Sequence, residues 1–268
     1  NAAFRPRIPR YDMYENEQER LGVTASLQFA PTDATSINFD ALYSKLDGSR
    51  TEMFLQAPVF SASGAANIGN VDVREAEIRT GPQGQTALVY GLFDDVDVRS
   101  EQRYDELTTD FTQFTLDGSH DFGNGLVFTA LAGMAESQHD NPKQTTLLFD
   151  AFDIDGYVYD YRRNDRLPLI SYGNLDVENP ASWKLSQIRL RPQTADNSFD
   201  TIEGTLAYEF NPEFTLRGGI QFKQYEFETT EKRRSKGTSA NLEADIPDSV
   251  KAISLADYSS LARLTGLG

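Results

Sequence analysis

The chain has 268 residues, no cysteine and a formal net charge of −16, with a sequence pI near 4.5. This acidity argues against nucleic acid as a partner, because such binding depends on lysine and arginine contacts to phosphates, and the lack of cysteine excludes disulfides, thiolate metal sites and a cysteine nucleophile. A mean hydropathy of −0.50, without an apolar run of about eighteen residues, excludes membrane-spanning helices but not membrane-spanning strands, whose hydropathy signal is weak.

The first predicted element is a hairpin at about residues 20–46. Apolar and polar residues alternate on both sides of a short turn that contains Pro31; the apolar positions are Val23, Ala25, Leu27 and Phe29 before it, and Ile37, Phe39, Ala41 and Tyr43 after it. Period-two alternation beside turn-forming residues is typical of two strands joined by a tight turn. The pattern predicts one apolar face and one wet face.

Two further hairpins are predicted at about residues 105–136 and 197–228. Their apolar positions are Phe114, Leu116, Leu126, Phe128, Ala130, Ala132 and Met134 in the second hairpin, and Leu206, Tyr208, Phe210, Phe214, Leu216, Ile220 and Phe222 in the third. Charged residues fall on the other face: Asp40, Arg217 and Lys223. We expect strands near 21–29, 36–46, 108–120, 126–136, 200–210 and 214–227 to pair consecutively, with the three short turns at one end.

Long polar connections separate the hairpins, at about residues 47–102, 137–196 and 229–268. The last of them contains two segments that predict brief helical turns, Pro247–Lys251 and Asp257–Arg263. Outer-membrane barrels have short turns on one side and long extracellular loops on the other, with aromatic residues at the lipid boundary, and here phenylalanines lie beside the short turns: Phe29, Phe122, Phe210 and Phe214. We therefore predict an all-β fold, an antiparallel up-and-down meander that is part of a transmembrane β-barrel; the alternative is an ordinary sheet with one buried face.

Several stretches resemble strands of TonB-dependent outer-membrane receptors, and they are spread over most of the chain: residues 7–11, 17–28, 96–104, 114–118, 166–170, 179–183 and 214–227. The resemblance implies energised import of a scarce nutrient, such as a siderophore–metal complex, a cobalamin or a saccharide. It also implies a barrel of about 22 strands with a plugged lumen. A TonB–ExbB–ExbD complex would drive this barrel through a short N-terminal box.

The sequence departs from that family because it contains no recognisable plug domain or TonB box and only about six core strands. We therefore expect residues 1–268 to be an internal barrel segment of a bacterial outer-membrane transporter, without enzymatic activity. Its expected partners are outer-membrane lipid and lipopolysaccharide, a small-molecule or oligosaccharide ligand, and the TonB–ExbB–ExbD complex through an N-terminal region that this sequence lacks. The alternatives are a passive porin-like channel and a secreted β-rich adhesin or carbohydrate-binding module.

The candidate ligand contacts are four aromatic residues in the second long connection: Tyr157, Tyr159, Tyr161 and Trp183. The three tyrosines alternate, so they share one face of a strand. They could stack on a sugar ring or a siderophore, or they could pack between tall strands, and Trp183 presents the same two possibilities.

No catalytic residue, cofactor or metal site is predicted. Asp150, Asp153, Asp155, Gly156 and Asp160 resemble a calcium loop only loosely, because the closing glutamate and the usual spacing are missing, so a solvated acidic loop is expected. The two histidines are far apart in sequence, and no nucleophile elbow occurs. A basic patch follows the third hairpin and fits either lipopolysaccharide phosphates or a solvated loop; it consists of Lys232, Arg233, Arg234 and Lys236.

Overall fold

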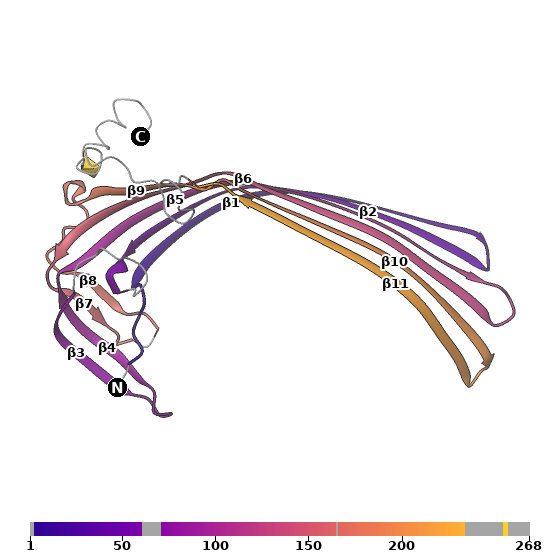
Figure 1. Cartoon of the computed structure of the whole chain (residues 1–268), viewed down its shortest axis with the longest axis horizontal. Coiled ribbons are helices and arrows are strands. Elements are labelled where there is room, and N and C mark those ends of the chain that lie inside the picture. The colour runs from indigo at the N-terminus through magenta and orange to yellow at the C-terminus, as the bar shows by residue number, and fades with distance from the viewer. Residues whose placement is uncertain (1–2, 61–70, 165, 234–253, 257–268) are drawn as a thin grey trace.

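The computed structural model describes residues 3–60, 71–164, 166–233 and 254–256 (Figure 1). These residues form a 7-stranded and a 4-stranded antiparallel sheet. The larger, or main, sheet contains β1 (Arg10–Thr32), β2 (Thr35–Gln56), β5 (Val96–Asp121), β6 (Leu126–Ile154), β9 (Lys184–Leu190), β10 (Gln193–Asn211) and β11 (Phe214–Glu231). The small sheet contains β3 (Asp72–Thr80), β4 (Thr86–Asp94), β7 (Tyr157–Asp160) and β8 (Leu169–Tyr172), and two 3-10 turns lie at Pro58–Phe60 and Pro180–Ser182.

The long strands of the main sheet lie side by side in the order β1-β2-β5-β6-β10-β11, and β9 pairs with the distal part of β6. This confirms the predicted antiparallel pairing of the three hairpins. Their three short turns lie together at one end of the sheet, which we call the turn end; we call the other end the loop end (Figure 1). No helix in the described part of the chain is long and apolar enough to cross a membrane.

The strands extend well beyond the predicted limits. β1 begins ten residues before the expected start of the first hairpin, and β6 continues to Ile154, so much of the connections at 47–102 and 137–196 is strand and not loop. The alternation is lost there because both faces of the sheet become polar, while the backbone pairing continues; Arg50, for example, lies directly opposite Asp105. Both predicted helical turns, Pro247–Lys251 and Asp257–Arg263, lie outside the described residues.

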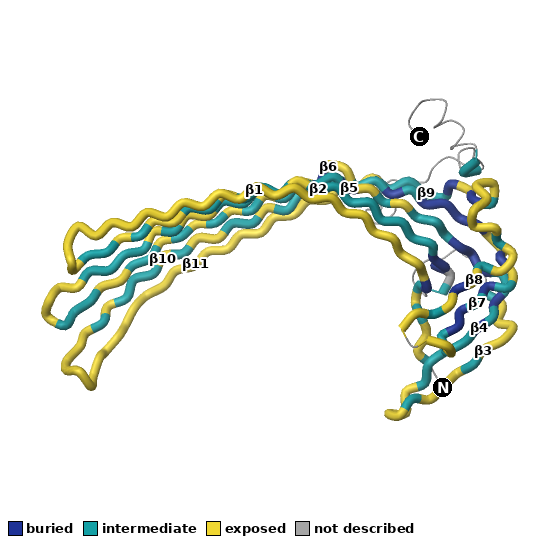
Figure 2. Tube along the Cα trace, turned by 180° about the vertical axis from the view of Figure 1, so that it is seen from behind, coloured by how far each residue is buried: buried dark blue, intermediate teal, exposed yellow. Residues whose placement is uncertain are grey.

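The small sheet lies inside a bend of the main sheet at the loop end (Figure 1). A core fills the space between the two sheets, and its buried members include Val98, Phe149, Ala151, Tyr157, Ile170, Trp183 and Leu185. Hydrogen bonds join the sheets as well: the Tyr172 hydroxyl donates to the Leu55 carbonyl at 3.3 Å, and the Ile170 N–H donates to the Tyr11 hydroxyl at 3.2 Å. Buried residues are concentrated at this end of the molecule (Figure 2).

Candidate functional site

An apolar surface crosses all six long strands near the turn end. Residues that lie directly opposite one another across the sheet form a ladder row, and rows two residues apart lie on the same face. Two successive rows of one face are apolar or glycine throughout. They are Leu27, Phe39, Leu116, Ala132, Ile202 and Phe222, and then Phe29, Ile37, Gly118, Ala130, Gly204 and Ile220. Apolar residues continue these rows on the same face: Leu21, Val23, Ala25, Ala41, Tyr43, Phe114, Leu126, Phe128, Met134, Leu206, Tyr208 and Leu216. We call this set the apolar band and its side of the main sheet the band face.

The apolar band is bare among the described residues. Ile220 is 83% exposed, Leu27 66% and Ile202 63%. Soluble monomers rarely expose one contiguous apolar surface of this extent, because its hydration is unfavourable. The band therefore requires an apolar partner that the described part of the chain does not supply.

The limit of the band toward the loop end runs diagonally across the sheet. The last apolar residue before a polar one is Leu21 on β1, Tyr43 on β2, Phe114 on β5, Met134 on β6, Ile202 on β10 and Phe222 on β11. From β1 to β11 this limit moves toward the turn end by three rows of the band face, which is six residues, over five steps between adjacent strands. With about 3.3 Å per residue and about 4.8 Å between strands, the slope is about 40°. A horizontal apolar layer would give this pattern on strands tilted by about 40°.

The opposite face of the main sheet, which we call the polar face, carries hydrogen-bonded side chains at the height of the band. The Asn38 amide donates to the Asp117 carboxylate at 2.9 Å, and the Gln221 amide donates to the Glu203 carboxylate at 2.7 Å. The charged residues expected on this face are there: Asp40, Arg217 and Lys223. One side of the sheet is thus suited to an apolar medium and the other to water.

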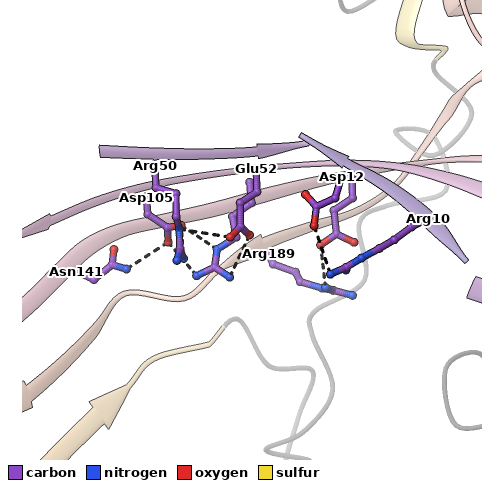
Figure 3. A network of polar contacts seen from close by, with 9 residues as sticks. Arg10, Asp12, Arg50, Glu52, Asp105, Asn141 and Arg189 are labelled. Atoms are coloured by element: carbon purple, nitrogen blue, oxygen red, sulfur yellow. Dashed lines mark hydrogen bonds and ion pairs between the residues drawn. The ribbon is translucent and has the colours of Figure 1, made fainter. Parts of the chain in front are cut away.

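A network of ion pairs occupies the polar face nearer the loop end (Figure 3). Its centre is Asp105, whose side chain has no exposed surface. Arg50 Nη2 lies 2.7 Å from Asp105 Oδ2, Arg103 Nε lies 2.9 Å from the same oxygen, and the Asn141 amide donates to Asp105 Oδ1 at 3.2 Å. Further pairs on this face are Arg99–Asp150, Arg103–Glu52, Arg189–Glu101 and Arg10–Asp12.

The partners of Asp105 keep it ionised. Burial by itself raises the pKa of this carboxyl, but hydrogen bonds from Arg50, Arg103 and Asn141 outweigh that effect and hold the pKa below its ordinary value. The network therefore joins β2, β5 and β6 through charged groups at neutral pH.

The structure places three of the four predicted ligand-binding aromatics in the core. Tyr157 is 0% exposed, Trp183 3% and Tyr159 9%. Tyr161 is half-buried and stacks on Tyr159, with ring centroids 6.1 Å apart, and the Trp183 indole N–H donates to the Val177 carbonyl at 3.3 Å. These contacts support packing between the two sheets. Stacking on a ligand stays a prediction, and Tyr157 has no open ring face for it.

The loosely calcium-like aspartates do not converge on one point. Asp150 pairs with Arg99 at 2.6 Å, and Asp160 pairs with Arg162 at 2.8 Å, so the two carboxylates serve separate ion pairs. No group of three or more histidine, aspartate or glutamate residues within the described ranges could hold a metal ion.

The two histidines lie on opposite faces of the main sheet. His120 is on the band face, bonded to the Thr35 hydroxyl, and His139 is on the polar face, bonded to the Thr109 hydroxyl. Of the basic patch, Lys232 and Arg233 follow β11, and the other two members lie outside the described residues.

The ion-pair network and the small sheet were not predicted. A signal for the network exists, because β5 carries charges of alternating sign at every second position: Arg99, Glu101, Arg103 and Asp105. Residues at this spacing share a face of a strand. A neighbouring strand with the complementary order, which β2 supplies through Arg50 and Glu52, then completes a lattice of ion pairs.

The comparisons with known proteins give no independent assignment. The chain matches no model of a known protein family, and no curated protein matches it either. Two features of the geometry therefore bear on function: a bare apolar band on one face of the sheet, and hydrogen bonds and ion pairs on the other.

Proposed function

We propose that this chain is part of the wall of an outer-membrane β-barrel receptor that imports a scarce nutrient with energy transmitted by TonB. The band face meets lipid, the polar face lines the lumen, and the loop end projects from the cell. The observation that carries the proposal is the diagonal limit of the apolar band. Strands of outer-membrane barrels are tilted by about 35–45°, so a lipid layer of constant height crosses their ladder rows obliquely, at the slope found here.

The main rival is a secreted β-rich module in which the apolar band is covered by protein. A protein core favours continuous apolar rows but imposes no constant height relative to tilted strands. The lengths of the strands also favour the membrane. A membrane strand needs about 9–11 residues, whereas β6 has 29, and the excess lies on the loop side, where the band face is charged: Glu17, Glu19, Asp47, Asp110 and Asp140.

Energised import is the more detailed part of the proposal. It rests on the resemblance of the strand segments to TonB-dependent receptors, and a passive channel would have the same wall. Under either reading β1 and β11 pair with strands beyond those described, because open strand edges leave backbone groups without partners in lipid. A siderophore–metal complex, a cobalamin or a saccharide remains the proposed class of cargo.

The membrane part of the proposal can be tested by site-specific fluorescence quenching. The chain has no cysteine, so a fluorophore can be attached to Ile220→Cys on the band face or to its neighbour Gln221→Cys on the polar face. The full-length protein is folded into vesicles of lipids with brominated acyl chains. We expect strong quenching at 220 and little at 221. Equal quenching at the two positions would contradict a lipid-facing band.

Transport is tested separately in cells. Deletion of TonB should abolish energised accumulation of the cargo while the amount of folded barrel stays unchanged. Uptake that does not depend on TonB would favour the passive channel and overturn this part of the proposal.

A further inference from the structure

The small sheet packs on the same side of the main sheet as the apolar band. On β2, the band residues Ile37, Phe39 and Tyr43 are separated from the core-contacting Leu55 by even numbers of residues. The pairing of β2 with β5 has no register shift from Thr35 to Gln56, so side chains alternate without interruption along this length. Leu55 therefore belongs to the band face.

The neighbouring strands give the same result. On β5, Val98 is an even number of residues from Leu116, a band residue, and Val98 is fully buried in the core. Ala151 of β6 lies directly opposite Val98, and Leu185 of β9 lies opposite Phe149 of β6. Each of these residues contributes to the core. One continuous face is thus bare at the turn end and covered at the loop end.

Several contacts hold the small sheet firmly on the main sheet. In addition to the core, Tyr11 and Tyr172 form hydrogen bonds between the sheets, and Phe60 packs edge-on against Phe93 with ring centroids 4.9 Å apart. Trp183, which follows the small sheet in the chain, also belongs to this core. Leu255 packs against the core, and its N–H donates to the Trp183 carbonyl at 2.9 Å. The position of the small sheet is therefore determined by the main sheet.

The polar face at the same height has a different surface. There the arginine and carboxylate side chains of the long strands pair with one another, as around Asp105 (Figure 3). Those arginines keep part of their surface in water; Arg50 and Arg103 are 24% and 27% exposed. The arginines and carboxylates of this face therefore form ion pairs with one another, and the arginines stay in contact with water.

We propose that the small sheet lies outside the barrel wall, above the outer leaflet, with the lipopolysaccharide headgroup layer as its partner, and does not close the mouth of the barrel. This inference rests on the proposed function, because the band face points to lipid only if the band lies in a membrane. The headgroup layer follows from continuity: a face that meets acyl chains at the turn end would meet headgroups next along the strands. The small sheet lies inside the bend of the main sheet (Figure 1), and this bend would bring it over that layer. The mouth is then bordered by the polar face and its ion pairs.

The test uses single cysteines in the full-length protein, folded into vesicles that contain lipopolysaccharide with a quencher on its core sugars. Ser171→Cys places a fluorophore on the exposed side of β8, and Asn16→Cys places the matched control on the polar face of β1 above the band. Ile220→Cys with brominated acyl chains is measured in parallel. We expect sugar-borne quenching several-fold stronger at 171 than at 16. An unchanged midpoint of thermal unfolding verifies that each variant is folded.

The outcomes separate the two proposals. Acyl-chain quenching at 220 with equal or weaker sugar-borne quenching at 171 than at 16 would overturn the external position of the small sheet and leave the membrane proposal standing. Absence of acyl-chain quenching at 220 would overturn the membrane proposal, and the inference with it. Strong quenching at 220 and a clear excess at 171 support both.

Discussion

The two ends of the band face differ in that one is covered by protein and the other is bare. At the loop end, residues such as Leu185 and Val98 are covered by the small sheet and have almost no exposed area, whereas at the turn end Ile220 and Leu27 are mostly exposed. Both ends are apolar, so composition alone does not distinguish them. The difference is that at one end the chain returns to cover its own strands, and at the other it turns back within two to four residues.

The comparison has a consequence for stability. The covered end should lose free energy of unfolding when its side chains are truncated, since protein atoms surround them. If its partner is lipid, as proposed, the bare end should be insensitive to truncation in water and sensitive to an added charge in a bilayer.

Leu185→Ala should have the largest effect. Leu185 is 2% exposed in the core between the sheets, and removal of such a side chain costs about 2–5 kcal/mol. The sole tryptophan, Trp183, is a core neighbour and reports local unfolding of the loop end in denaturant. Leu190→Ala on the same strand is the control, because Leu190 is 40% exposed and should change little. Equal losses for the two variants would contradict a core at this end.

Asp105→Asn should lower the free energy of unfolding by about 3 kcal/mol, since removing one partner of a buried ion pair leaves the others without compensation. The affected cations are Arg50 and Arg103. Denaturant unfolding measures the loss. Because the pKa of Asp105 is depressed in the folded protein, its contribution is present above the unfolded pKa and disappears as pH falls through the folded pKa. The difference between parent and Asp105→Asn should therefore shrink in acid; a difference that grew in acid would contradict this assignment.

Ile220→Lys should destabilise the full-length barrel in vesicles by about 2–4 kcal/mol, as expected for a lysine near the bilayer midplane. Phe214→Lys, beside the turn, should cost only about 0–1 kcal/mol because the proposed membrane position places residue 214 at the interface. Gln221→Lys, on the polar face, should be close to neutral. Reversible folding into lipid measures all three. Equal penalties at 220 and 214, or a larger one at 221, would show that the band does not face lipid.

The smallest effect is expected for Lys143→Ala, outside both surfaces of the comparison. Lys143 Nζ lies 2.7 Å from Glu106 Oε2, but the two side chains are 60% and 40% exposed. An exposed pair of this kind contributes about 0–1 kcal/mol, so unfolding in denaturant should shift only slightly. A loss as large as that of Asp105→Asn would show that surface pairs, and not the buried carboxylate, hold the extended strands together.

The sequence was sufficient for the three hairpins and for the residues that share a face within them. Alternation of apolar and polar residues around Pro31, Gly123 and Pro212 locates the turns, and because side chains alternate with a period of two, a turn position determines which residues share a face. The same reasoning failed for the outer halves of β5 and β6, where Arg103 and Thr146 lie on one face and Tyr104 and Thr145 on the other. With polar residues on both faces, no alternation of apolar and polar residues remains to indicate a strand.

Only the tertiary structure decided which apolar residues are covered. In the sequence Tyr157 and Trp183 fit either stacking on a ligand or packing between strands, and the structure buries them. Ile220 and Phe222 are equally apolar in the sequence and remain bare. Local pattern determines strand, turn and face because these depend on neighbours in the chain. Burial depends on which distant segment returns to a surface, and that return, of the small sheet onto Leu55 and Val98, leaves no periodic mark in the sequence.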